Sequence, residues 1–410
     1  MKKKYLLFLV LGLVLLSLVV SNACAGGAKG LKIGVLMSMT GDLASYGPDI
    51  SKGVELAKKH LNEAGGILGG NVETVIKDDQ TNPTAGVDAA KKLIELDKVP
   101  AIVGALSSGV TMAVAESAAV PNKVVLISPA STSPAVAALK DDNYVYRTTP
   151  SDALQGVVLG KLAYDLGFKK AASLYVNNAY GQGLADEFAK AYAKLGGKVT
   201  ASVAIEQEQP SYDAELKKAT ADTPDVLLAL SYPESAKVYL KQAIEKNYAK
   251  KFLFCDGTKS PEMVTAIGAS YLEGMYGTAA GPEESDLTKW FADVYKAAYG
   301  QLPPKPYIGE AYDAAVIIAL AAQKAGKADG KAIRDALKFV ANPPGEKIGP
   351  KPEDLKKAIQ LIKDGKDIDY DGVAGPQDFD TNGDVISTIQ IWKIVKGAII
   401  ADRYELPAIQ

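Results

Sequence analysis

The chain has 410 residues, a length at which two or three domains are more common than one. Hydrophobic residues make up 48% of it and charged residues 23%, which is typical of a globular protein and excludes wholesale disorder. The formal net charge is −2 at pH 7, and no run of Lys or Arg beyond the first residues suggests a nucleic-acid-binding surface. We therefore expect a globular protein with no nucleic-acid partner.

The N-terminus has the three parts of a secretory signal. Lysines at positions 2–4 precede an apolar run over residues 5–20, and the small-residue segment SNACAGG follows. This 16-residue run is shorter than the roughly 20 residues that span a bilayer, although a single uncleaved anchor remains an alternative. We expect residues 1–25 to be a cleaved signal peptide. The competing interpretation is a lipoprotein signal in which Cys24 is acylated and anchors the chain.

The chain contains two cysteines, Cys24 and Cys255. If Cys24 is removed with the signal or acylated, Cys255 has no partner and the mature fold contains no disulfide. The apolar surroundings of the second cysteine, FLFCDG, indicate a buried structural thiol rather than a reactive one.

From residue 31 onwards, short apolar runs alternate with segments of helical periodicity. Runs this short and this rich in Val, Ile and Leu are typical of strands buried on both faces: LKIGVLMS, VETVIKDD, PAIVGA, KVVLISP, AASLYV, DVLLALS and KFLFCD. The alternation runs once over about residues 31–150 and again over about 151–280, and further helices and a final hairpin follow. This pattern predicts an α/β protein made of two doubly wound parallel-sheet lobes that face one another.

The first helical segment, GPDISKGVELAKKHLNEAGG, has a clear apolar stripe. Ile50, Val54, Ala57 and Leu61 fall on one face of a helix with 3.6 residues per turn. His60, the one histidine of the chain, stands among charged neighbours, so we expect it to be a solvated residue of this helix.

The residues that most enzyme and cofactor sites need are scarce. A single histidine cannot form a multi-histidine metal site, and a solvated one does not provide the usual Ser-His-Asp or Cys-His pair. The chain contains no G-x-x-x-x-G-K-[ST] loop, and MSMTGDLASYG follows the first strand in place of G-x-G-x-x-G. We therefore expect neither an enzyme nor a bound cofactor or metal ion.

One acidic motif needs a separate interpretation. The segment DFDTNGD, residues 378–384, matches the start of an EF-hand calcium loop, but the last ligand position of such a loop falls on Ile389. Asn382 and Gly383 also form a strong turn signal. We interpret the segment as a turn, with a calcium site as the alternative.

Small hydroxyl residues follow strands of the first series. Ser108 comes after the strand in VGALSSGV, just where a helix begins, and Ser131 and Thr132 come after the strand in LISPASTSP. Ligands of open α/β sheets bind at the carboxyl ends of the strands, and a helix start offers free N–H groups. We hypothesise that these residues receive a small, partly anionic ligand. The alternative is that they are ordinary helix caps.

The second series places larger side chains at the same position. Tyr180, Tyr232 and Asp256 each stand just after a strand. Two aromatic rings and a carboxylate would suit a ligand that has an ammonium group and an apolar part. The alternative for each residue alone is a surface tyrosine or a turn aspartate.

These residues carry a resemblance to a known family. From Leu31 to about Ile394, the chain resembles the type I periplasmic binding proteins, in particular the leucine/isoleucine/valine-binding receptors of ABC transporters. The resemblance rests on KIGVLMSMTGDLASYG, GVELAKKHLNEAGGI, VGALSSGVT, LISPASTSP, YGQGLADEF and GPQDFDTNGD, in this order. It implies two lobes joined by three crossovers, with residues 26–150 and 282–387 in the first lobe and 151–281 and 388–410 in the second.

The resemblance also implies roles for the residues at the cleft. Ser108, Ser131 and Thr132 would hold the α-carboxylate of the ligand and share its ammonium group, and Asp256 stands where relatives use a glutamate for that group. The walls of the site would be formed by three tyrosines, Tyr46, Tyr180 and Tyr232. Because Asp256 is one methylene shorter than glutamate, either the lobes sit closer together or the ligand differs.

The expected function is that of an extracytoplasmic, periplasmic receptor that captures a small amino acid of the branched-chain type by hinge closure. Its partners would be this small-molecule ligand and a membrane ABC permease complex, and we expect a monomer. The segment over residues 341–372 is longer than in compact amino-acid receptors. A receptor for an amide or an aromatic acid, or a sensory ligand-binding protein, therefore remains an alternative.

Overall fold

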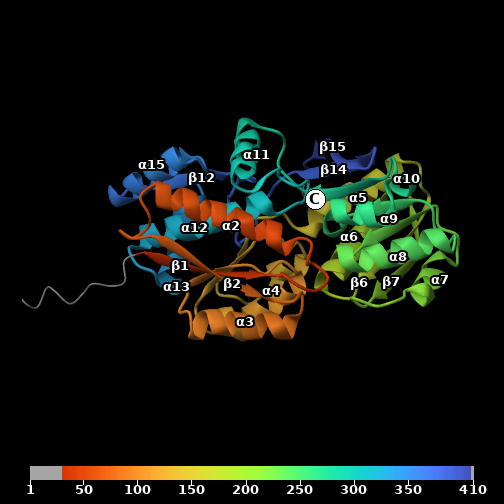
Figure 1. Cartoon of the computed structure of the whole chain (residues 1–410), viewed down its shortest axis with the longest axis horizontal. Helices are drawn as coiled ribbons and strands as arrows, with labels where there is room; N and C mark the ends of the chain where they lie inside the picture. Colours follow the sequence, from red (N-terminus) through yellow and green to blue (C-terminus); the bar gives the residue numbers. More distant parts are fainter. Residues whose placement is uncertain (1–29, 408–410) are drawn as a thin grey trace, which may run out of the picture.

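All seven apolar runs predicted to be strands form strands in the computed structural model, which describes residues 30–407. The predicted signal peptide and the possible lipid anchor at Cys24 lie outside the described residues. Six of the seven runs are mainly buried, whereas VETVIKDD is largely half-buried or exposed because it forms an edge strand. The strands belong to two sheets, which lie side by side along the long axis of the molecule (Figure 1).

The first sheet has five parallel strands in the order β2-β1-β3-β4-β5. Its central strands carry apolar side chains on both faces, as expected for a parallel sheet covered by helices. The strands are β1 (Leu31–Met37), β2 (Val72–Asp78), β3 (Ala101–Val103), β4 (Val125–Ser128) and β5 (Val145–Arg147).

The second sheet has seven strands in the order β15-β14-β10-β9-β8-β6-β7. The five strands that come first in the chain are parallel to one another, and the predicted C-terminal hairpin joins them in antiparallel orientation. The strands are β6 (Lys170–Val176), β7 (Lys198–Ile205), β8 (Val226–Leu230), β9 (Phe252–Phe254), β10 (Tyr276–Ala280), β14 (Ile389–Val395) and β15 (Ala398–Glu405).

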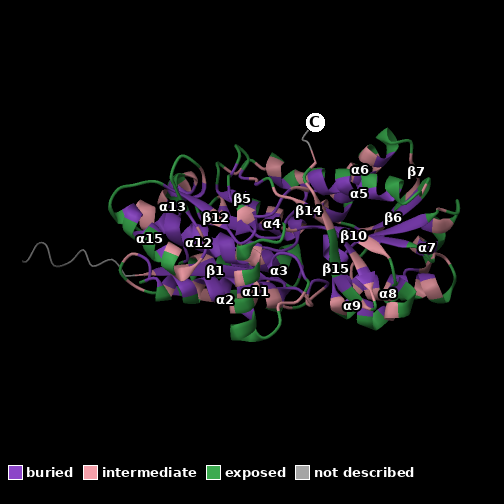
Figure 2. Cartoon of the chain, turned by 90° about the horizontal axis from the view of Figure 1, so that it is seen from above, coloured by how far each residue is buried: buried purple, intermediate pink, exposed green. Residues whose placement is uncertain are grey.

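Helices cover both sheets, as the alternating pattern predicts (Figure 2). Around the first sheet lie α2 (Gly47–Glu63), α3 (Pro83–Glu95), α4 (Ser108–Val114) with the π-helical turn Ala115–Ala119, the 3₁₀ turn Pro134–Ala138, α11 (Asp286–Tyr299), α12 (Ile308–Ala325), α13 (Gly330–Ala336), α14 (Lys338–Ala341) and α15 (Pro352–Lys363). Around the second lie α5 (Asp152–Asp165), α6 (Ala179–Lys194), α7 (Asp213–Thr220), α8 (Pro233–Glu245), the 3₁₀ turn Asp256–Thr258, α9 (Pro261–Ile267) and α10 (Ala269–Leu272).

The chain passes between the two lobes three times. It leaves the first sheet after β5 and enters α5, returns after β10 to α11 and α12, and crosses again before β14. Two doubly wound lobes joined by three crossovers are therefore present, as predicted. A small additional sheet lies beside α15, within and just after the long segment over residues 341–372. It consists of β11 (Glu346–Ile348), β12 (Ile368–Gly372) and β13 (Gly375–Pro376).

The predicted apolar stripe of α2 is confirmed, but the prediction for His60 is wrong. Ile50, Val54, Ala57 and Leu61 are fully buried, and His60 is also buried, at 4% exposure. The reason is that α12 packs along α2, so the buried face is wider than the stripe alone suggests. The imidazole Nδ1 of His60 lies 2.9 Å from the hydroxyl of Tyr312 on α12.

Over residues 30–407, no helix is both long and apolar enough to cross a membrane.

Candidate functional site

A small cavity lies between the lobes at the carboxyl ends of the strands. Its volume is about 20 Å³, room for no more than a few water molecules. It is lined by Leu43, Tyr46, Ile50, Leu106, Ser108, Ala130, Tyr180, Tyr232, Asp256, Gly257 and Tyr307. We call it the cleft cavity.

Five of the seven residues singled out from the sequence line the cleft cavity: Tyr46, Ser108, Tyr180, Tyr232 and Asp256. They come from both lobes. Tyr46 immediately precedes α2 and Ser108 begins α4 in the first lobe, whereas the other three come from α6, the N-terminus of α8 and the turn after β9 in the second.

Ser131 and Thr132 are not among the lining residues, although Ala130, directly before them, is. Both hydroxyls are buried and have partners within the protein. The Ser131 hydroxyl lies 2.7 Å from that of Thr111, and the Thr132 hydroxyl donates to Asp152 Oδ2 at 2.8 Å. These two residues therefore shape the loop beside the cavity in this arrangement.

Asp256 is the buried carboxylate of the cleft cavity. Its Oδ1 accepts hydrogen bonds from Gln155 Nε2 and from the Tyr180 hydroxyl, both at 2.7 Å, and its Oδ2 accepts one from the Tyr307 hydroxyl at 2.6 Å. Burial raises the pKa of Asp256, and the three donors oppose that rise because they stabilise the ionised form. A positively charged group next to it would be strongly favoured.

A second carboxylate, Asp152 at the start of α5, is fully buried close by. Burial and the charge of Asp256 raise its pKa well above the usual range. Within the described part of the chain, its Oδ1 has no hydrogen-bond partner. The second lobe thus brings two carboxyl groups to the cleft, those of Asp152 and Asp256, and none of the residues that line the cavity is a lysine or an arginine.

Aromatic rings fill the second-lobe side of the cavity. The rings of Tyr180 and Tyr232 stack with centroids 5.4 Å apart and an interplanar angle of 7°. Their hydroxyls point in different directions, because Tyr180 donates to Asp256 whereas Tyr232 donates to Ser107 Oγ of the first lobe at 3.0 Å. The pair forms a flat apolar wall with polar edges.

Further hydrogen bonds join the two lobes and indicate a closed arrangement. Tyr46 donates to the carbonyl oxygen of Asp256 at 2.8 Å. The buried carboxylate of Asp42 accepts from the backbone N–H of Ser235 at 2.7 Å and from its hydroxyl at 2.9 and 2.8 Å. Asp42 belongs to the first lobe and Ser235 to α8 of the second, so these bonds cannot persist if the lobes separate.

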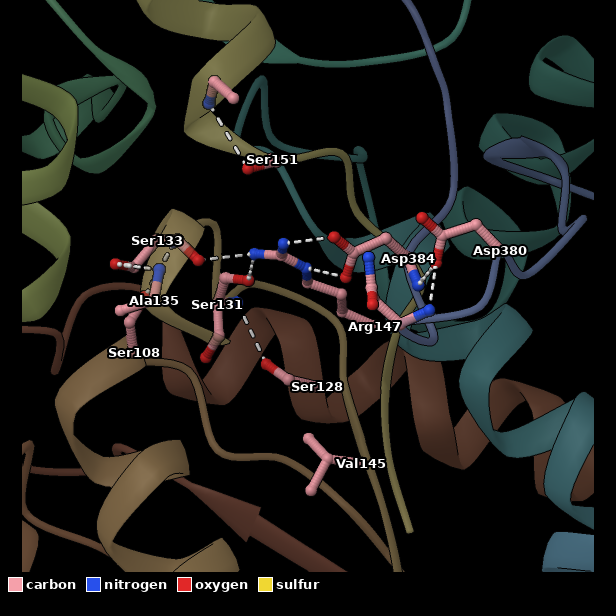
Figure 3. Close-up of polar contacts among 12 residues, drawn as sticks. Ser108, Ser128, Ser131, Ser133, Ala135, Val145, Arg147, Ser151, Asp380 and Asp384 are labelled. Atoms are coloured by element: carbon pink, nitrogen blue, oxygen red, sulfur yellow. Dashed lines mark hydrogen bonds and ion pairs between the residues drawn. The ribbon is translucent and has the colours of Figure 1, made fainter. Parts of the chain in front are cut away.

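A buried arginine holds the loop that contains Ser131 (Figure 3). The guanidinium of Arg147 donates from Nη1 to the carbonyl oxygens of Ser131 and Ser133, at 3.1 and 2.8 Å. It also forms two parallel bonds to Asp384, from Nε to Oδ1 at 2.5 Å and from Nη2 to Oδ2 at 2.6 Å. The loop therefore has a fixed position relative to a segment more than 200 residues later in the chain.

The acidic motif over residues 378–384 is a turn, as expected. Asp380 Oδ1 accepts from the backbone N–H groups of Asn382 and Asp384, at 2.7 and 3.0 Å. Gly383 has a φ of 76°, and its carbonyl oxygen accepts from the backbone N–H of Arg147 at 3.0 Å. Because the carboxylate of Asp384 is bound by Arg147, the motif supports the cleft loop.

Cys255 is buried and free, as predicted, and burial raises the pKa of its thiol to about 12. The thiol lies 3.1 Å from the hydroxyl of Tyr180. It therefore helps to position this tyrosine rather than acting as a nucleophile.

Two residues that meet Asp256 do not follow a strand and were not predicted. Tyr307 stands at the N-terminus of α12 with a left-handed backbone, φ 76°, after a proline-rich loop. Gln155 is buried on α5, DALQGVVLGKLAYD. The sequence signal that could have indicated it is a single amide side chain within an otherwise apolar stretch of this helix.

The family model described as "Periplasmic binding protein" matches residues 30–398. Among similar proteins, the Leu/Ile/Val-binding protein homolog 1 of Brucella suis is 31% identical over 313 residues, which cover 75% of this chain and 81% of the relative. The chemotactic signal transduction system substrate-binding protein BasB of Halobacterium salinarum is 30% identical over 348 residues, 83% of this chain and 81% of the relative.

Solved structures show the same fold. The branched-chain amino acid transporter substrate-binding protein of Streptococcus pneumoniae, in complex with isoleucine, superimposes with a TM-score of 0.76 at 26% identity. The match covers 92% of this chain and 99% of that structure, so it includes both lobes and the crossovers.

Proposed function

Because the chain belongs to the periplasmic binding protein family, we propose that it is a receptor that captures a small amino acid of the branched-chain type and delivers it to an ABC permease. Proteins of this family bind solutes and are not enzymes. The proposed monomer works outside the cytoplasm. Its lobes correspond to residues 26–150 with 282–387 and residues 151–281 with 388–410.

The observation that supports an amino acid ligand most directly is the position of Asp256. Its carboxylate is buried, lines the cleft cavity and lies near a second carboxyl group, that of Asp152. An ammonium group entering this region would favour the ionised form of these carboxyl groups, and charge-assisted hydrogen bonds of this kind contribute about 1.5–3 kcal/mol each.

The opposite wall provides a place for the carboxylate of the ligand. Ser108 lines the cavity at the first turn of α4, which continues into the π-helical turn Ala115–Ala119. The first N–H groups of a helix have no partner within it and favour negative charge. We assign the carboxylate to Ser108 and to the loop of Ser131 and Thr132, and the apolar side chain to Tyr46, Tyr180 and Tyr232.

The mechanism we propose is hinge closure. A cavity of about 20 Å³ is too small for an amino acid, so the lobes must separate before a ligand can enter. The ligand then bridges the two lobes and favours a closed state in proportion to its differential affinity for the two arrangements. The cross-lobe bonds of Asp42, Tyr46 and Tyr232 form only as closure is completed.

The test compares leucine with 4-methylpentanoate, which is leucine without its ammonium group. In the wild-type protein we expect calorimetry to show much tighter binding of leucine. The variant Asp256→Ala should weaken leucine binding by about a hundredfold and leave 4-methylpentanoate nearly unchanged. An equal loss for both ligands would show that Asp256 does not bind the ammonium group.

Two alternatives remain to be tested, a different class of ligand and a sensory role in place of transport. A thermal-shift panel of aliphatic, aromatic and acidic amino acids, amides and aromatic acids distinguishes the ligands, since a ligand at 100 times its Kd adds about 2.7 kcal/mol of stability. A sensory role has one specific observation in its favour, the chemotactic system to which the Halobacterium relative belongs. A sensor-kinase gene next to this one would support that role, whereas permease and ATPase genes would support transport.

A further inference from the structure

A second cavity lies between the lobes on the other side of Tyr307, which is the one residue that lines both. We call it the hinge pocket. Its volume is about 220 Å³, compared with about 20 Å³ for the cleft cavity. It is lined by Lys259, Ala280, Gly281, Pro282, Glu284, Thr288, Phe291, Leu302, Pro303, Pro304, Lys305, Pro306, Tyr307, Ile308, Gly309, Glu310, Val373, Ala374, Gln390 and Tyr404.

The walls of the hinge pocket have the composition of a small-molecule site. Four prolines, Phe291, Leu302 and Ile308 form most of the surface, and a few polar groups converge on it. The polar wall comes from the second lobe. There Lys259 Nζ donates to Gln390 Oε1 at 2.5 Å, and Gln390 Nε2 donates to the Tyr404 hydroxyl at 2.9 Å.

Two lysines line this pocket, and their environments differ. The ammonium of Lys305 is fully paired, with Asp49 Oδ2 at 2.8 Å, Glu262 Oε1 at 2.6 Å and the carbonyl oxygen of Ser45 at 2.6 Å. Lys259 is buried at 8% exposure, and within residues 30–407 its ammonium has no ion pair and contacts one amide oxygen. Burial lowers the pKa of Lys259 to about 8, and the nearby carboxyl group of Glu310 opposes this shift.

The opposite wall carries Glu310 in the first turn of α12, at 5% exposure. Burial raises its pKa to about 8, and the ammonium group of Lys259 opposes this rise. The pocket therefore presents a lysine with a single polar contact in the described residues, a buried carboxyl group and an apolar surface. A buried charge in this situation is stabilised by an anion with an apolar body.

We propose that the hinge pocket binds a small apolar monocarboxylate, whose carboxylate pairs with Lys259 and whose apolar part packs against Phe291, Leu302 and the prolines. This site is separate from the cleft cavity and does not depend on the identity of the ligand there. Because its walls come from both lobes, its occupant contacts the hinge directly.

The experiment measures binding of 4-methylpentanoate at pH 7 by ligand-observed NMR and calorimetry, in the wild type and in two variants. Leucine is present at a concentration that saturates the cleft, so the binding measured is that of a second site. We expect Lys259→Met to weaken this binding at least tenfold while leucine binding changes less than about threefold. We expect the opposite from Asp256→Ala, which should retain 4-methylpentanoate and lose leucine. This double comparison separates failure of the hinge site from failure of the proposed function.

Further variants and one further ligand complete the test. Leu302→Trp fills the pocket without removing the charge and should also abolish 4-methylpentanoate binding. Lys296→Met, on the exposed side of α11, is the matched lysine control and should have no effect. No binding to the wild type up to about 10 mM would overturn the proposal. It would also be overturned by equal binding to Lys259→Met, or by tighter binding of 3-methylbutylamine than of the carboxylate.

Discussion

The two faces of the cleft are built on different principles. The part of the first-lobe face around α4 consists of small groups, Ser108, Ala130 and the loop that follows, with larger apolar and tyrosine side chains beside it. The guanidinium of Arg147 fixes the position of this loop through bonds to two of its carbonyl oxygens. The second-lobe face consists of large or charged groups, Tyr180, Tyr232 and Asp256, whose hydroxyls and carboxylate bond to one another or across the cleft. The first lobe thus contributes a loop of fixed position, and the second lobe contributes two aromatic rings and a carboxyl group.

If the first-lobe loop depends on Arg147 for its position, removing this side chain should destabilise the protein. We expect Arg147→Met to lower the free energy of unfolding by about 3–5 kcal/mol, since it leaves Asp384 without its partner and two carbonyl oxygens without donors. Chemical denaturation measures this loss. Arg334→Met is the control: its ion pair with Asp335 is solvent-exposed, so the loss there should stay below about 1 kcal/mol. Equal losses would show that the buried pair adds nothing.

A pH dependence is expected where the two faces meet at Asp42. Burial in the closed state raises the pKa of Asp42 to about 6 from its usual 3.8. If opening restores the usual pKa, the closed state binds a proton more readily than the open one, and ligand affinity should fall as the pH rises from about 4 to about 6. Above that range the ionisation of Asp42 should cause no further change in affinity.

Asp42→Asn removes this ionisation but keeps an acceptor for Ser235. We expect the variant to bind leucine about tenfold more tightly than the wild type at pH 7.5 and equally well at pH 4. Calorimetry over this range measures the difference, with Glu245→Gln, at the exposed far end of the same helix, as the control. Weaker binding of leucine to Asp42→Asn at pH 7.5 would show instead that the ionised carboxylate of Asp42, through its bonds to Ser235, favours closure.

The smallest effect should come from the edge of the aromatic wall. Tyr232→Phe keeps the stacked ring but loses the bonds to Ser107 at 3.0 Å and from Asn178 at 3.1 Å. Leucine affinity should fall about threefold to tenfold. Tyr239→Phe, which loses a bond to Ser231 within the second lobe, should leave affinity unchanged. Identical affinities for the two variants would mean that the cross-lobe bond does not contribute to closure.

Much of the fold could be predicted from the sequence because parallel strands buried on both faces form continuous apolar runs. The strands outside the prediction lack this signal. At the sheet edge, β7 is only partly buried, β5 has three residues, and β10 reads YGTAA with no β-branched aliphatic residue. The error at His60 has a similar origin, since helical periodicity does not report how many neighbours cover a helix.

The site was predictable where a side chain directly follows a strand. This rule located Ser108, Tyr180, Tyr232 and Asp256, and the family resemblance added Tyr46. It could not locate Tyr307, whose side chain reaches Asp256 because of a left-handed backbone after a proline-rich loop. Nor could it show that Thr132 bonds to Asp152, because that contact depends on how α5 leaves the crossover.

The bond between Arg147 and Asp384 also has a consequence for the order in which the protein can mature. The first sheet is complete once residue 147 has been synthesised, but the anchor of its cleft loop lies 237 residues later. The helix that covers α2 is likewise encoded after the entire second sheet except its C-terminal hairpin. A nascent chain can therefore anchor the Ser131 loop only after residue 384 has been synthesised, and a product truncated before that residue would lack this anchor.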